Sequence, residues 1–221
     1  MSVTSPDAMP EIIQTGEEAA YELRCAEASL WTASRLFIAC STFAFGALGF
    51  AYFYLRSSNS SDLWRPAGVT APSGLGTAVF GLTVAGALLA VYGSARLRRG
   101  SILDWEVAGW MAVFAGLVAA GLQAFELTRL GFWPGSSGYA SVFVGYAPLN
   151  VALLLAATYW LETLLARSIR LRRALAQDGG AASSQRPPAR LFRASVDGCT
   201  YYWSYAAVVS LVFWLLFYVV H

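Results

Sequence analysis

The sequence predicts an all-α, polytopic membrane protein, a helix bundle with five transmembrane helices. Apolar residues make up 57% of its 221 residues and charged residues only 13%, which is too hydrophobic for an ordinary soluble domain. Five separate stretches are also long and apolar enough to cross a bilayer, whose hydrocarbon core requires roughly 20 residues of helix. Water is therefore not the main solvent of this chain.

The five stretches are each bounded by Arg clusters or by Gly, Pro and Ser turns. The predicted spans are 31–55, 73–95, 107–130, 139–165 and 199–220. They form one transmembrane domain, 31–221, with a flexible loop at 166–198 that contains the linker Gln177–Ala189. Residues 1–30 form a separate segment without a signal-peptide core, so no cleavage is expected. From Gly16 onward this segment resembles a surface helix that runs into the first span.

The arginines predict the orientation of the chain, because basic loops stay on the cytoplasmic side of a membrane. Ten arginines lie in the two connections at one end of the predicted bundle, and three lie in the connections at the other. The richer set is Arg96, Arg98, Arg99, Arg167, Arg170, Arg172, Arg173, Arg186, Arg190 and Arg193, and the poorer set is Arg56, Arg65 and Arg129. The prediction is that the N-terminus lies on the cytoplasmic side of the membrane and the C-terminus on the opposite side.

Composition excludes several kinds of chemistry. The chain has no lysine, so it cannot form the Schiff base of a retinal pigment. Its single histidine, His221, is its last residue, so it cannot supply two imidazoles to a haem or a histidine cluster to a metal. Its three cysteines lack metal-ligand spacing and read as small buried hydrophobic residues: Cys25, Cys40 and Cys199.

Small and aromatic residues fit a membrane bundle. Glycines in the first three spans allow close helix packing: Gly46, Gly49, Gly76, Gly81, Gly86, Gly109, Gly116 and Gly121. Aromatic residues near the span ends are expected to form interfacial belts: Tyr52, Tyr54, Trp64, Trp105, Trp110, Trp133, Tyr201, Tyr202 and Trp203.

Ionisable residues inside the spans are candidate functional residues, because burying them without a partner is costly. Glu126 is the main candidate. Gln123 and Arg129 lie three residues to either side of it, on the same helix face, and together these three are the structural or proton-related candidates. The simpler interpretation is that Glu126 pairs with Arg129 or Gln123.

Three further polar residues have simple interpretations. Arg35 and Glu162 each lie about one turn inside a span, so both can extend to the cytoplasmic face or meet each other. Asn150 follows Pro148 by two residues and is expected to bond a carbonyl that the proline frees.

Five short segments resemble subunit III of the haem–copper cytochrome oxidases, in its five-helix bacterial form. Gln123–Phe132 is similar to a Gln-x-x-Glu segment of this family, and Trp64–Pro66 to its W-P element. The other three are Leu36–Arg56, ending in AYFYLR; Ser141–Val151, SVFVGYAPLNV; and Tyr202–Tyr218, which is similar to the family's closing Y-W-H run. The resemblance extends from about Leu30 to the C-terminus.

The chain departs from this family at most protonatable positions. Ser41 stands where the family has a buried glutamate, and Ala147 and Asn150 stand where it has two histidines. Ser204 and Ala207 replace a histidine and an aspartate of its last span. Proton handling at those positions is therefore in doubt, whereas Gln123, Glu126, Tyr202 and Trp203 match the family.

The resemblance implies an accessory subunit without a catalytic site. Haem and copper would reside in partner subunits I and II, and this chain would hold no cofactor except phospholipid. It would support assembly, lipid binding and sustained proton-coupled turnover of the catalytic subunit. Arg35, Tyr202 and Trp203 are the candidates to face lipid or a partner, and no nucleic-acid partner is expected.

Three alternatives stay open from the sequence. The partner could be a related nitric oxide reductase, whose accessory protein shares the fold. A small membrane transporter could use Gln123, Glu126 and Asn150 to line a path, although no inverted repeat or pair of broken helices is visible. A membrane-bound enzyme would need catalytic groups that the spans do not offer.

Overall fold

The computed structural model describes residues 8–58, 64–66, 68–177 and 187–220. In these ranges the chain forms α1 (Ala8–Ser57), α2 (Ser73–Arg98), α3 (Ile102–Thr128), α4 (Gly138–Gln177) and α5 (Pro187–Trp214), and α5 continues into a π-helical turn, η1 (Leu215–Val219). Each of the five α-helices contains a stretch long and apolar enough to cross a membrane. The predicted fold class is confirmed: the chain is a multi-pass, all-α membrane bundle.

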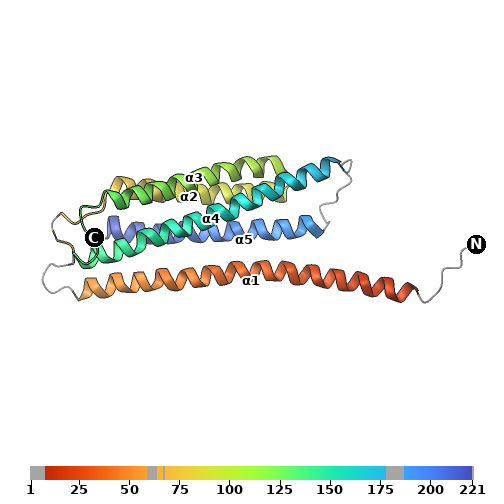
Figure 1. The fold of residues 1–221 in the computed structure, drawn as a ribbon, viewed down its shortest axis with the longest axis horizontal. Coiled ribbons are helices and arrows are strands. Elements are labelled where there is room, and N and C mark those ends of the chain that lie inside the picture. The colour runs from red at the N-terminus through yellow and green to blue at the C-terminus, as the bar shows by residue number, and fades with distance from the viewer. Residues whose placement is uncertain (1–7, 59–63, 67, 178–186, 221) are drawn as a thin grey trace, which may run out of the picture.

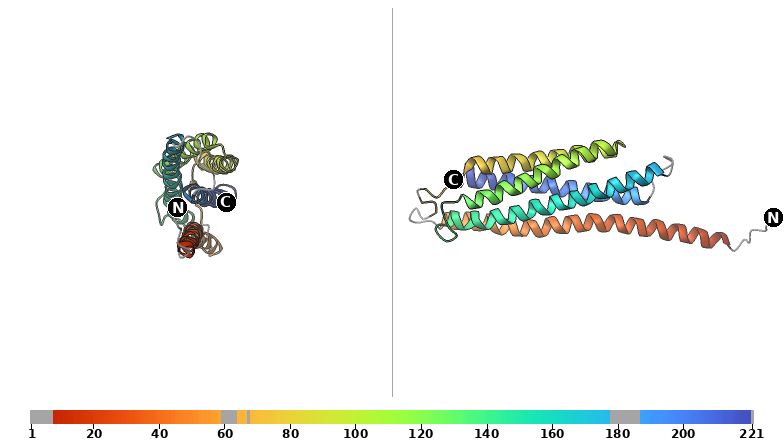
Figure 2. Two further views of the ribbon diagram at one scale, coloured as in Figure 1. Left: turned by 90° about the vertical axis from the view of Figure 1, so that its right-hand side faces the viewer. Right: turned by 45° about the horizontal axis from the view of Figure 1, so that its top comes forward.

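The helices run antiparallel in sequence order, and α5 completes a four-helix group with α2, α3 and α4 (Figure 1). The end-on view of Figure 2 shows α1 to one side of this group, where it packs chiefly against α4 and α5. The N-terminal part of α1 projects beyond the ends of the other helices (Figure 1). The C-terminal end of α5 lies at the opposite end of the bundle, beside the α3–α4 connection.

Three of the helices are much longer than the predicted spans. Residues 166–177 and 187–198 were expected to be a flexible loop, and the structure corrects this, because α4 extends to Gln177 and α5 begins at Pro187. Arg, Leu and Ala favour helix even in water, so α4 continues past the apolar stretch. Proline is compatible with the first turn of a helix, which explains the start of α5. Most of the predicted linker Gln177–Ala189 lies outside the described residues.

Trp203 packs at the centre of the four-helix group. Its side chain is 0% exposed, and a Cβ on Gly86 or Gly116 would lie within 2.6 Å or 2.8 Å of its ring. Its indole N–H donates to the carbonyl oxygen of Ala157 over 3.2 Å. One side chain of α5 therefore contacts α2, α3 and α4, and the two glycines provide the space for it.

Several expectations about aromatic, cysteine and glycine residues are corrected. Tyr52, Trp64, Trp105, Tyr202 and Trp203 are buried in the core, whereas Tyr54, Trp110, Trp133 and Tyr201 are exposed on the surface of the protein. Cys25 and Cys40 are exposed on α1, and only Cys199 is buried. Gly46, Gly49, Gly81 and Gly121 have open space around them and make no close helix contact. The aromatic residues near the span ends thus fill the bundle core as often as they mark its surface.

Candidate functional site

The most distinctive polar group of the bundle lies near the C-terminal end of α3. Gln123 and Glu126 are 2% and 0% exposed, although they lie in an apolar helix. Residues three apart share a helix face, and the Gln123 amide nitrogen donates to Glu126 Oε2 over 2.6 Å. The predicted pairing of these two side chains is therefore confirmed.

Arg129 does not take part in this group. It caps α3, its side chain is exposed, and its guanidinium carbon lies 4.9 Å from the centroid of the Phe125 ring. The predicted pairing of Arg129 with Glu126 is wrong, because α3 ends between them at Thr128 and the last turn directs the arginine away from the core.

The second oxygen of Glu126 binds a residue that the sequence did not indicate. The hydroxyl of Tyr218 in η1 donates to Glu126 Oε1 over 2.6 Å. The carboxylate thus accepts one short hydrogen bond from its own helix and one from the end of α5. Both hydrogen bonds are short for their type.

Asn150 extends the group to α4. Its amide nitrogen donates to Gln123 Oε1 over 2.9 Å, and its side chain is 0% exposed. The expectation that Asn150 bonds a carbonyl freed by Pro148 is therefore corrected: the amide turns inward to α3. Asn150, Gln123, Glu126 and Tyr218 form a continuous hydrogen-bonded series across three helices, here called the polar chain.

The π-helical turn presents Tyr218 to Glu126. In η1 the Val220 N–H donates to the Leu215 carbonyl oxygen, five residues earlier, over 2.8 Å. The wider turn leaves other carbonyls available: the Tyr52 hydroxyl donates to Leu216 over 2.8 Å, and the Tyr139 hydroxyl donates to Phe217 over 3.3 Å.

The Tyr218 ring occupies the space beside Gly76 of α2, where a larger residue would have its side chain. A Cβ on Gly76 would lie 2.1 Å from the ring, so no other residue fits there without displacing the tyrosine. The same region has a small cavity of about 10 Å³, lined in part by Gln123, Tyr146, Ser210 and Tyr218. Such a volume has room for about one water molecule.

Two buried polar atoms, one in the polar chain and one beside it, have no hydrogen-bond partner among the described residues. These are Oδ1 of Asn150 and Oγ of Ser210, the latter in a residue that lines the cavity. Buried polar groups usually find a partner in protein or in ordered water. The polar chain can therefore bind α3, α4 and α5 together, but its cavity has no room for a solute.

The other predicted site residues lie apart from the polar chain. Arg35 and Glu162 are exposed and form no ion pair with each other, and the Arg35 guanidinium carbon lies 5.8 Å from the Trp31 ring centroid. Tyr202 and Trp203 were expected to face lipid or a partner and are instead 1% and 0% exposed. The sequence placed them near the start of a span, whereas α5 begins at Pro187 and puts both near its middle.

Ion pairs at the Arg-rich end of the bundle join α3 to α4 a second time and join α2 to α5, a pair that the polar chain does not connect. Glu106 of α3, 7% exposed, accepts from Ser168 over 3.1 Å and pairs with Arg172 over 3.3 Å. Asp197 of α5 accepts from Ser94 over 2.9 Å and pairs with Arg98 over 2.8 Å. The sequence analysis did not single out either acid, although each faces arginines at the same membrane border.

No candidate metal centre is found in the part of the chain that the structure describes, where no three His, Cys, Asp or Glu side chains lie together. No family model matches the chain, and no curated protein matches it. The fold and the contacts of the residues described above are therefore the basis for any functional proposal.

Proposed function

We propose that this chain is an accessory, non-redox subunit III of a haem–copper terminal oxidase in an aerobic respiratory chain. It supports assembly, lipid binding and sustained proton-coupled turnover of the catalytic subunit I, beside subunit II. Haem and copper belong to those partners. In this proposal the chain lies in a bacterial plasma membrane, with its N-terminus cytoplasmic and its C-terminus periplasmic or extracellular.

One observation gives the main support. Three residues that match this family, Gln123, Glu126 and Trp203, also join the helices. Gln123 and Glu126 connect α3 to α4 and α5, and Trp203 connects α5 to the other helices of the four-helix group. A scaffold subunit depends on such contacts, because its role is to hold a fixed surface for a partner.

The residues that depart from the family fit the same role. Asn150 stands where the family has a histidine, and it keeps a hydrogen-bond donor without a group that titrates near neutral pH. Ala147, at the other histidine position, is 0% exposed in the core. These replacements favour a structural role for the polar chain over proton transfer.

The same replacements support a second candidate, the accessory subunit of a related nitric oxide reductase, since loss of the histidines removes part of the oxidase pattern. The small-transporter alternative has less support. Gln123, Glu126 and Asn150 bond to one another, and the cavity beside them is about 10 Å³.

Co-purification tests the proposal. The tagged full-length chain should be isolated from its native membrane in mild detergent, with identification of the co-purifying subunits and an optical spectrum of the preparation. The expected result is a haem-containing catalytic subunit with the spectrum of an oxidase, whereas the spectrum and subunits of a nitric oxide reductase would select the second candidate. Isolation of the chain without any haem subunit would contradict both.

Matched tryptophan variants show whether the bundle itself presents the partner surface. Trp203→Ala removes the buried contact between α5 and its neighbours, so it should reduce the yield of haem subunit per chain. Trp133→Ala changes a side chain that is 82% exposed and lies in the α3–α4 connection, so its yield should match that of the unmodified chain. If both variants gave the same yield of haem subunit per chain, partner binding would not depend on the buried Trp203 contact, which would contradict this expectation.

A further inference from the structure

Two helices of this chain run far past the membrane at the Arg-rich end of the bundle. α1 has 50 residues and α4 has 40, so at 1.5 Å per residue both greatly exceed the roughly 30 Å of a hydrocarbon core. They are level at the other end, because a Cβ on Gly138 of α4 would lie 3.3 Å from the Leu55 Cβ of α1. Measured from that level along each helix, Glu22 and Arg170 both lie about 50 Å away, at nearly the same depth.

The acids at this end of α1 face away from the rest of the chain. Glu27 marks the inner face of the helix, since it pairs with Arg190 of α5 over 3.0 Å. With 3.6 residues per turn, Glu18 and Glu22 lie on the opposite side. Both are exposed, and no ion pair of the described residues includes either of them. Further along the same side, large exposed apolar residues at seven-residue intervals complete what is here called the outer face of α1: Leu36, Phe43 and Phe50.

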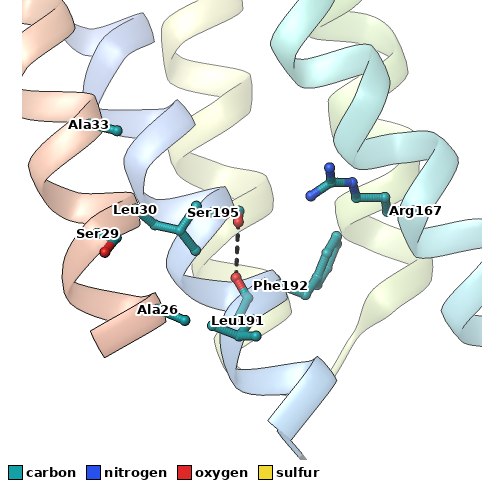
Figure 3. A pocket seen from close by; sticks show the side chains of 8 residues that line it. All are labelled: Ala26, Ser29, Leu30, Ala33, Arg167, Leu191, Phe192 and Ser195. Carbon is teal, nitrogen blue, oxygen red and sulfur yellow. Dashed lines mark hydrogen bonds between the residues drawn. The ribbon is translucent and has the colours of Figure 1, made fainter. Parts of the chain in front are cut away.

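α4 has a basic outer face at the same depth. Arg172 points to α3, where it pairs with Glu106 over 3.3 Å, and Arg167 extends toward the pocket between α1 and α5 (Figure 3). Arg170 and Arg173 lie on the remaining side of the helix, and both are exposed. No carboxylate of the described residues pairs with Arg170. The outer face of α4 consists of these two arginines and of the exposed Leu155 and Tyr159.

A third charge on each helix extends the match into the membrane. Arg35 of α1 and Glu162 of α4 each lie about one turn inside the predicted spans, are exposed, and have no ion pair among the described residues. An ionisable group at this depth is costly without a partner. Their depths differ by about 6 Å, which an arginine side chain can bridge. When the two outer faces are set against each other, both residues lie on the same flank of the contact.

The charges along the two outer faces are therefore complementary. From the Arg-rich end inward, α1 carries acid, acid and base, whereas α4 carries base, base and acid. Within one copy both faces point away from the bundle, so they cannot meet. Two copies in one membrane lie at the same depth, so the outer face of α1 in one copy can meet that of α4 in another with each acid opposite a base.

We propose that copies of this chain associate side by side in the membrane, with the outer face of α1 in one copy against the outer face of α4 in the next. The two arginines of α4 face the two acids of α1 outside the hydrocarbon core, and Arg35 faces Glu162 at its border. Because the contact joins different surfaces, it can repeat from copy to copy. The association requires only a second copy and a membrane, so it goes beyond the proposed accessory role.

Two differently tagged copies of the full-length chain test this contact. They should be expressed together, extracted from the membrane in mild detergent and isolated through one tag, and the amount of the second tag should then be measured. Unmodified copies should co-purify. Absence of the second tag would overturn the proposal, whether or not a haem subunit is present.

Charge reversal at the membrane border tests the register of the two helices. Arg35→Glu in both copies sets two acids against each other, and Glu162→Arg sets two bases, so each should lower co-purification about tenfold. Arg99→Glu is the matched control, because Arg99 is exposed at the end of α2 and its reversal changes the net charge as much as Arg35→Glu does. It should co-purify as the unmodified copies do. A similar loss in all three variants, or no loss in any, would overturn the proposed contact.

Co-expression of the two variants distinguishes a contact between copies from one within a copy. When one copy carries Arg35→Glu and the other carries Glu162→Arg, an acid again faces a base in every contact between unlike copies. Co-purification of the two tags should then return to the level of the unmodified chain. Misfolding of either variant, or an ion pair within one chain, would allow no such recovery, so a persistent loss would overturn the proposal.

Discussion

Tyr218 donates a hydrogen bond to Glu126 over 2.6 Å and so joins the end of α5 to the end of α3, 92 residues earlier in the chain. Gln123 supplies the other short hydrogen bond to the same carboxylate. The predictions about the polar chain depend on this pair, because removal of either donor leaves a buried carboxylate oxygen without its partner.

Tyr218→Phe should destabilise the bundle while its ring still fills the place that Gly76 leaves open. An unsatisfied buried acceptor costs about 1–3 kcal/mol, so the purified variant should unfold at a lower temperature in detergent. Tyr159→Phe is the matched control, because Tyr159 is 70% exposed. The same melting temperature for both variants would show that the Tyr218 hydroxyl contributes nothing to stability.

Glu126→Gln should be mild and Glu126→Ala more damaging. A glutamine side chain accepts from Tyr218, and reversal of the Gln123 and Asn150 amides together would keep a hydrogen bond between each neighbouring pair. Alanine leaves Tyr218 and Gln123 without an acceptor, at about 1–3 kcal/mol for each unsatisfied donor. Thermal unfolding and retention of partner subunits measure this difference.

A proton-transfer role for Glu126 predicts a different result. Glutamine does not titrate, so Glu126→Gln would then abolish oxidase turnover per haem as completely as alanine while the complex stayed assembled. That outcome would replace the structural interpretation of the polar chain with a catalytic one.

Gly116→Ala and Gly121→Ala should differ sharply although both lie on α3. A Cβ on Gly116 would lie 2.3 Å from the Thr158 hydroxyl and 2.8 Å from the Trp203 ring, whereas Gly121 has open space around it. Overpacking of this kind costs about 1–3 kcal/mol, so only the Gly116 variant should melt early. Gly121→Ala should be neutral or slightly stabilising, because alanine favours helix.

The topology of the chain can be tested with reporter fusions. The excess of arginine at one end of the bundle predicts cytoplasmic signals for fusions after Arg99 and Gly180, and periplasmic signals for fusions after Ser60 and at His221. A cytoplasmic signal at His221 would contradict both the orientation and the five-span count.

The purified chain should be colourless when it is separated from the haem-containing subunits that the proposal assigns to it. It has only one histidine, so it cannot supply a pair of histidine ligands to a haem, and it has no lysine to bind retinal. The measurement is a visible absorption spectrum of the isolated, reduced polypeptide. If the isolated chain bound haem in a one-to-one ratio without any other subunit present, the accessory-subunit proposal would be wrong.

The fold could be predicted from the sequence because hydropathy alone determines which segments can cross a bilayer. Helix ends were harder to predict: α1 contains the helix expected from Gly16 into the first span, but α4 and α5 extend past their apolar stretches, where composition gives a weaker signal. This error had a direct consequence for Tyr202 and Trp203. In the predicted span, which begins at residue 199, these two residues lie near the start of the helix. In the structure α5 begins at Pro187, so they lie near its middle, where they are buried.

The polar chain was only half predictable, and the reason is the range of its contacts. Gln123 and Glu126 lie three residues apart, and helix geometry alone places them on one face. Asn150 and Tyr218 reach them from 27 and 92 residues away. Tertiary packing decides such contacts, and a tyrosine in an aromatic C-terminal segment gives no local sign of a buried partner.

The position of α1 has a consequence for biosynthesis. This helix is made well before α4 and α5, yet it packs chiefly on those two helices. At roughly 5–20 residues per second, the segment between Ser57 and Pro187 takes on the order of ten seconds to translate. During that interval α1 lacks its contacts with α5, so a chain stalled before α5 would leave α1 only partly packed and accessible to the quality-control proteases of the membrane.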